Sequence, residues 1–325
     1  MNSRAKSALR LLAWTAGLGL VALLIWRTGP RLIARQLVDV GPRFLWLVGA
    51  YFAGTALGAL PWRWLLPADA RPRVAHTLAG RFAASGFNAL FPLLGAGEAC
   101  RLLWLPRSSW WQGVAAIVVD RLLFSIAGAA LLGGGLWAAL WIPGLPPSFL
   151  IAGGLTALAI LGAVLAVAGM GRSGRTLALL RRAAHRLHLP ATIGELESER
   201  IDATLAALLR GRRRVLVAGL AWHVAGRACL TAEIYFGLRA LNVGVTLPEV
   251  LVFAAIPVAL SIVGTFIPSQ LGVQEAVQGL ASALLGIGAA VGVSLVLLMR
   301  VRQILFVSLA GVLIASAPSR RTRPR

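Results

Sequence analysis

The chain has 325 residues, of which 58% are apolar and 13% are charged, and its mean hydropathy is +0.80. A water-soluble domain carries about a quarter charged residues. The composition therefore excludes an ordinary soluble enzyme, a disordered chain and a secreted disulfide scaffold, and it predicts membrane spans. The 32 basic against 11 acidic residues give a net charge of +21. Because apolar runs separate the basic clusters, we interpret this charge as cytoplasmic loops facing anionic lipid headgroups, not as a nucleic-acid surface.

The N-terminal half begins with a basic stretch and an apolar run from Leu11 to Trp26, which we expect to be an uncleaved first helix. Residues 27–43 carry Arg27, Arg31 and Arg35 at helical spacing and predict an amphipathic helix at the membrane interface. Further spans are expected at 44–66, 110–141, 149–170 and 215–238, with a last one before the arginine-rich C-terminus.

Sidedness follows from the basic residues. The segment 171–214 holds ten arginines and four acids, and we predict that it is a central cytoplasmic loop lying on the headgroups. The loops after 110–141 and 215–238 are short and nearly uncharged, as expected for the outer side. Both termini are then cytoplasmic.

Two segments, 74–94 and 249–267, are long enough to span a membrane, yet each ends at a proline and glycine break followed by an acid. The break residues are Pro92, Gly95 and Gly97 in the first segment and Pro268 and Gly272 in the second. If both segments are re-entrant helical hairpins, the chain has six spans plus two hairpins. Residues 148–317 then repeat residues 1–142 upside down, the inverted-repeat architecture of transporters. If both segments instead cross the membrane completely, the hydropathy pattern gives about eight spans. The sequence leaves both topologies open, and in either case it predicts a single all-α membrane domain.

Ionisable residues at membrane depth are the strongest functional signal, since each costs about 2.5–3.5 kcal/mol on insertion scales. Their mixed signs predict pairs around an inward cavity. Glu98 and Arg101, three residues apart, can share one helix face, and Glu275 has Arg300 or Arg302 as its natural partner. The candidate headgroup-binding residues are Arg81, Asn88, Glu98, Arg101, Asp120, Arg121, Gln270, Gln274, Glu275, Arg300 and Arg302. Backbone N–H groups after Gly97 and Gly272 would suit a phosphate.

Structural explanations compete with these functional ones. Asp120 and Arg121, which interrupt a long apolar span, could form a plain inter-helix salt bridge. Arg227 and Glu233 lie nearer the ends of their span, where we expect them to reach the interface. Seven tryptophans at segment ends predict an interfacial aromatic belt; they are Trp62, Trp64, Trp104, Trp110, Trp111, Trp137 and Trp141. Signatures of a phosphate-binding P-loop, a zinc protease or a serine hydrolase are missing from the sequence, so no catalytic residue, metal or cofactor is predicted.

These motifs together resemble the transmembrane region of lysylphosphatidylglycerol synthases, a family of flippase-like membrane proteins. The resemblance rests on Asn88-Ala-Leu-Phe-Pro92, Gly97-Glu98-Ala-Cys-Arg101, Asp120-Arg121 and the segment from Pro268 to Glu275. It implies a multi-pass protein of the bacterial inner membrane that handles an aminoacylated, polyprenyl-linked or other isoprenoid lipid. It also implies that Glu98, Arg101, Asp120, Arg121 and Glu275 line the headgroup path. No aminoacyl-transferase domain follows in this chain, so synthesis of a lysyl-lipid is not expected.

The sequence thus favours a flippase or transporter for an anionic or isoprenoid-type lipid. A membrane-embedded lipid-modifying enzyme with Glu98, Asp120 or Glu275 as acid or base is the alternative. A third hypothesis is a scaffold that recruits enzymes of lipid biosynthesis, hopanoid synthesis included, through residues 171–214. Membrane lipids are the expected partners, and self-association stays open.

Overall fold

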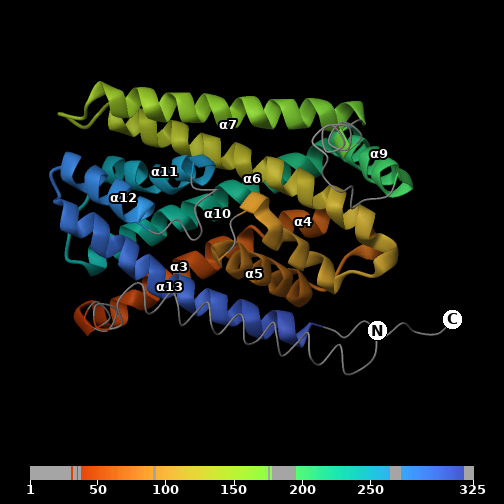
Figure 1. The fold of residues 1–325 in the computed structure, drawn as a ribbon, viewed down its shortest axis with the longest axis horizontal. Helices are drawn as coiled ribbons and strands as arrows, with labels where there is room; N and C mark the ends of the chain where they lie inside the picture. The colour runs from red at the N-terminus through yellow and green to blue at the C-terminus, as the bar shows by residue number, and fades with distance from the viewer. Residues whose placement is uncertain are drawn as a thin grey trace.

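The computed structural model describes residues 31, 35, 38–90, 93–174, 176–177, 195–263 and 272–317. Within these ranges the regular structure is helical, and the helices form an elongated bundle (Figure 1). The predicted first helix at Leu11–Trp26 lies outside the described residues, as do Pro92, Pro268, Gln270 and most of the proposed interfacial helix.

Five helices of the described ranges are long and apolar enough to cross a membrane. They span Val38–Leu65, Arg107–Ala139, Pro147–Ser173, Arg213–Ala240 and Ala289–Ser316. These match five of the six predicted spans, and the sixth is the N-terminal one. The all-α membrane fold is therefore confirmed for the part of the chain that the structure describes.

Helices α6, Trp110–Ala139, and α7, Pro147–Ser173, lie side by side along one edge of the bundle (Figure 1). The charged pair at Asp120 does not interrupt α6, which continues unbroken for 30 residues. Proline in the first turn of α7 suits a helix start, and Gly174 ends the helix at a φ of 68°, a left-handed conformation that favours glycine. Helix α9, Glu195–Gly211, comes from the predicted basic loop and packs against both α6 and α7.

Helices α3, Phe44–Leu57, and α10, Arg213–Ala240, cross at very close range in the middle of the bundle. A Cβ at Gly54 would lie 2.8 Å from the carbonyl oxygen of Gly226, and a Cβ at Gly226 would lie 3.0 Å from that of Gly54. Small residues at membrane helix crossings let the two backbones approach. This crossing fixes one wall of the candidate site.

The two predicted hairpin segments are each a pair of helical segments in contact. Helix α5, Val74–Leu90, packs along the 3₁₀ helix η3, Leu93–Trp104. Helix α11, Leu247–Val263, is followed by and touches α12, Val273–Leu284. Helix α13, Ala289–Ser316, packs on both α5 and α12 and so joins the two pairs (Figure 1). Re-entry of each pair from one membrane side stays a prediction.

The tryptophan belt is wrong at two positions. Trp62, on the short helix α4, Leu60–Leu65, is 1% exposed and donates Nε1–H to the Gly113 carbonyl oxygen at 3.4 Å. Trp104 is also buried, whereas Trp137 and Trp141 are 62% and 68% exposed. Position at a segment end is a weak guide here because α4 packs against α6 and α10, which bury Trp62.

Candidate functional site

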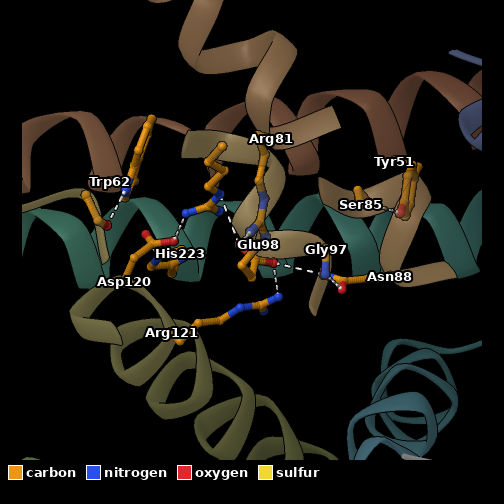
Figure 2. A network of polar contacts seen from close by, with 12 residues as sticks. Tyr51, Trp62, Arg81, Ser85, Asn88, Gly97, Glu98, Asp120, Arg121 and His223 are labelled. Atoms are coloured by element: carbon orange, nitrogen blue, oxygen red, sulfur yellow. Dashed lines mark hydrogen bonds and ion pairs between the residues drawn. The ribbon is translucent and has the colours of Figure 1, made fainter. Parts of the chain in front are cut away.

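The amide side chain of Asn88 joins the end of α5 to η3. Its Oδ1 accepts the backbone N–H of Gly97 at 2.7 Å, and its Nδ2 donates to Glu98 Oε1 at 3.0 Å (Figure 2). A Cβ at Gly97 would lie 2.5 Å from the Ala84 carbonyl oxygen, so glycine alone fits. Asn88 thus accepts the N–H of Gly97 itself, and binding of a phosphate by the N–H groups that follow Gly97 stays a prediction.

Glu98 is the centre of the site. It is 5% exposed and contacts arginines from three segments, with Arg81 on α5, Arg101 on η3 and Arg121 on α6. Figure 2 shows Arg81 and Arg121 reaching its carboxylate from opposite sides. Arg101 Nε lies 2.9 Å from Oε2 and Arg81 Nη1 lies 3.5 Å from it, so the predicted pairing of Glu98 with Arg101 is confirmed.

A buried chain of polar groups continues from Arg101. Its Nη1 donates to Asp120 Oδ2 at 2.6 Å, and the other oxygen, Oδ1, lies 2.9 Å from His223 Nε2 on α10 (Figure 2). The exposed fractions of Arg101, Asp120 and His223 are 1%, 0% and 2%. The Arg101 guanidinium also lies 5.7 Å from the Trp62 ring centroid. Asp120 thus pairs across helices with Arg101, not with its neighbour Arg121.

A polar cavity of about 280 Å³ opens beside Glu98, among α3, α5, α6 and α10. Its charged lining residues are Arg81, Glu98, Arg121 and Arg227. Three guanidiniums and one carboxylate leave a net charge of +2 with His223 neutral. Arg101 and Asp120 stay behind the wall, and we infer that they hold the site together without facing the cavity.

Phe124 brings three of these cations together. The guanidinium carbons of Arg81, Arg121 and Arg227 lie 5.5, 5.1 and 4.0 Å from its ring centroid. An aromatic face attracts a cation through its quadrupole without adding negative charge. The ring therefore gathers positive charge at the cavity while leaving it available to an anion.

The second acid-bearing segment is organised differently. Glu275 accepts the N–H of Gly272 itself at 2.9 Å and pairs with Arg300 Nε at 3.1 Å as predicted. Binding of a phosphate by the N–H groups that follow Gly272 stays a prediction. Arg300 Nη1 donates to Gln303 Oε1 at 3.1 Å, and Gln303 Nε2 donates to the Ala89 carbonyl oxygen at 2.8 Å. A polar connection thus runs from α12 through α13 to the end of α5.

Glu233 does not reach the interface, so that prediction is wrong. It is 2% exposed and lies 2.9 Å from Arg302 Nε. The Arg302 guanidinium also lies 3.6 Å from the ring centroid of Tyr51, and the Tyr51 hydroxyl is 2.8 Å from that of Ser85. Glu275, Arg300 and Arg302 do not line the polar cavity, and Gln274 lies partly buried in the first turn of α12.

Sequence reasoning missed His223, Arg227 and Phe124 as lining residues. His223 was missed because the four histidines of the sequence show no metal-ligand spacing that would single one out. Its place in the middle of an apolar span was the usable signal, since ionisable residues there mark functional sites. Phe124 had no signal, because apolar side chains are ordinary in a span.

A model of the lysylphosphatidylglycerol synthase transmembrane region matches residues 11–311 of the chain. No curated protein and no solved structure matches the chain significantly.

Proposed function

The chain belongs to the lysylphosphatidylglycerol synthase transmembrane-region family, and we propose that it moves an anionic or isoprenoid-type lipid between the leaflets of the bacterial inner membrane. The family and the apolar helices support a multi-pass membrane protein with a lipid-related role. Movement between the leaflets, the class of lipid and the inner membrane are what we propose beyond these findings.

The polar cavity is the observation that carries this proposal. It lies within a bundle whose helices are long enough to cross a membrane, and its lining charges sum to +2. Isolated charges at membrane depth are costly, and they mark substrate pathways when they face an inward cavity. Arginine binds phosphate through two parallel N–H donors, so Arg121 and Arg227 are suited to a lipid phosphate.

The hairpin hypothesis supplies the pathway. Helix α12 has 12 residues and is about 18 Å long at 1.5 Å per residue, well short of a hydrocarbon core of about 30 Å. Non-helical backbone at membrane depth requires burial in protein or a cavity. A lipid headgroup would cross between the two hairpins while its hydrocarbon chain stays outside the polar cavity.

Glu98 is the proposed switch. The side chain of Arg121 is 32% exposed, whereas that of Arg101 is 1% exposed, so Arg121 is the partner that a headgroup can reach. A phosphate that binds Arg121 would release it from Glu98 and leave Arg101 in place. Glu98 would then bind a coupling proton or keep Arg81.

Leaflet accessibility of a fluorescent lipid in vesicles tests the proposal. Vesicles with the purified chain and fluorescent phosphatidylglycerol or polyprenyl phosphate should expose the inner-leaflet label to an external quencher. We expect Arg121→Gln to slow this exchange about tenfold, because it removes a charge-assisted contact. Arg107→Gln, which removes an exposed arginine outside the cavity, is the matched control. Equal rates for wild type, both variants and empty vesicles would refute the proposal.

A second candidate function is lipid modification. The Asp120–His223 pair is a buried carboxylate and imidazole in contact, and the imidazole lines the polar cavity. A carboxylate that orients a histidine is a common arrangement for general acid–base chemistry. Mass spectrometry of the vesicle lipids separates the two functions, since an enzyme changes lipid mass and a flippase changes only its leaflet.

A further inference from the structure

An apolar groove of about 620 Å³ opens between α6, α10 and α11. This volume is typical of small-molecule binding sites, which measure about 300–1,000 Å³. Small side chains and glycine form much of the lining on α6 and α10, and the polar lining residues are Arg227, Thr231 and Tyr235. Of its lining residues, Arg227 alone also lines the polar cavity at Glu98.

Arg227 lines both the groove and the polar cavity. Its guanidinium lies 4.0 Å from the Phe124 ring centroid, and its buried Nε has no hydrogen-bond acceptor among the described residues. Arg227 is also absent from the ion pairs that bind Arg81, Arg101 and Arg121. Arg227 therefore has no carboxylate partner in the described part of the chain, and it lies where the apolar groove meets the positively charged polar cavity.

We propose that the groove holds the hydrocarbon chain of a phosphate-bearing lipid whose phosphate binds Arg227. This arrangement matches an amphiphile, because an anionic headgroup meets the cavity with net positive charge while the chain follows the apolar groove. The proposal rests on the proposed lipid-handling function and adds a chain site and a phosphate ligand to it. A second, neutral class of lipid would fill the groove without using Arg227.

Two neighbouring glycines of α6 allow a matched test of the groove. A Cβ at Gly133 or at Gly134 would meet no heavy atom within 4 Å, so each position tolerates a side chain. Only Gly134 lines the groove. Gly134→Leu therefore fills the chain site, and Gly133→Leu adds the same side chain one residue away.

The experiment is photo-crosslinking of the full chain in nanodiscs. One probe is phosphatidylglycerol with a diazirine on an acyl chain, a second is polyprenyl phosphate with a diazirine, and a third is neutral diazirine diacylglycerol. We expect either phosphate probe to form adducts on residues 127–134 and 224–235. Gly134→Leu should lower this labelling about tenfold, and Gly133→Leu should preserve it. Arg227→Gln should lower labelling by the phosphate probes about tenfold and leave that by the neutral probe unchanged.

The outcomes separate the groove from the flippase. Equal labelling of Gly133→Leu and Gly134→Leu would show that the probes react from the surrounding bilayer only, and it would overturn the chain site. A groove that none of the probes labels would also overturn it. Should Gly134→Leu fail to fold, as judged by size-exclusion chromatography, Ala228→Leu fills the same groove from α10. Labelling that depends on Gly134 and Arg227 in a protein that does not exchange lipid would support the groove and refute the flippase.

Discussion

Replacement of Arg101 by methionine is expected to destabilise the fold strongly, because Arg101 stands between two buried carboxylates. Glu98 keeps Arg81 and Arg121 after the change, whereas Asp120, 0% exposed, keeps only His223 among the described residues. Removing one partner of a buried ion pair costs about 3–5 kcal/mol. We therefore expect Arg101→Met to lower the free energy of unfolding by about that amount.

A second substitution tests the reasoning. Asp120→Asn in the Arg101→Met background removes the stranded charge and keeps the side-chain shape. A buried polar group without its partner costs about 1–3 kcal/mol, and more when it is charged, so the double variant should be more stable than Arg101→Met by about this amount. If Arg101 and Asp120 were independent, the losses of unfolding free energy caused by the two single substitutions would instead add in the double variant.

Unfolding in a detergent titration, followed by tryptophan fluorescence, measures these free energies. Trp62 lies 5.7 Å from the Arg101 guanidinium and reports on the same region. A loss below about 1 kcal/mol for Arg101→Met would show that the ion pair contributes little. A double variant less stable than either single one would refute the account of a stranded Asp120.

Two further predictions concern other parts of the bundle. Gly226→Leu should destabilise the fold by about 1–3 kcal/mol or more, because the new side chain meets the Gly54 carbonyl oxygen. Gly162→Leu is the control and should leave the stability unchanged, since no atom lies within 4 Å of a Cβ at this position. Equal melting temperatures for the two variants would contradict the close crossing of α3 and α10. Arg302→Met should lower the melting temperature, because it leaves the buried carboxylate of Glu233 without its cation. Adding Glu233→Gln to this variant should restore part of the lost melting temperature. A further decrease in the double variant would argue against the Arg302–Glu233 ion pair.

The sequence predicted the helical bundle and the Glu98–Arg101 pair because both depend on local periodicity. Apolar runs mark spans whatever their neighbours are, and residues three apart meet on any helix. The pairing of Glu275 with Arg300 could also be predicted, since few cations in the second half of the chain lie at membrane depth.

The cross-helix pairs could not be predicted in the same way. Asp120 and Arg121 are adjacent in the chain, yet they face different partners, Arg101 and Glu98, because successive residues of a helix point about 100° apart. Which partner each meets depends on how η3 packs against α6. The burial of Glu233 likewise depends on its contact with α13, which no spacing reveals.

Phe124 lets the chamber stay electrically unbalanced. A carboxylate in its place would lower the net charge of the polar cavity from +2 to +1, and an arriving phosphate would then compete with a second carboxylate besides Glu98. The phenyl face attracts the guanidiniums without adding a countercharge, so the cavity keeps a net positive charge that suits an anion.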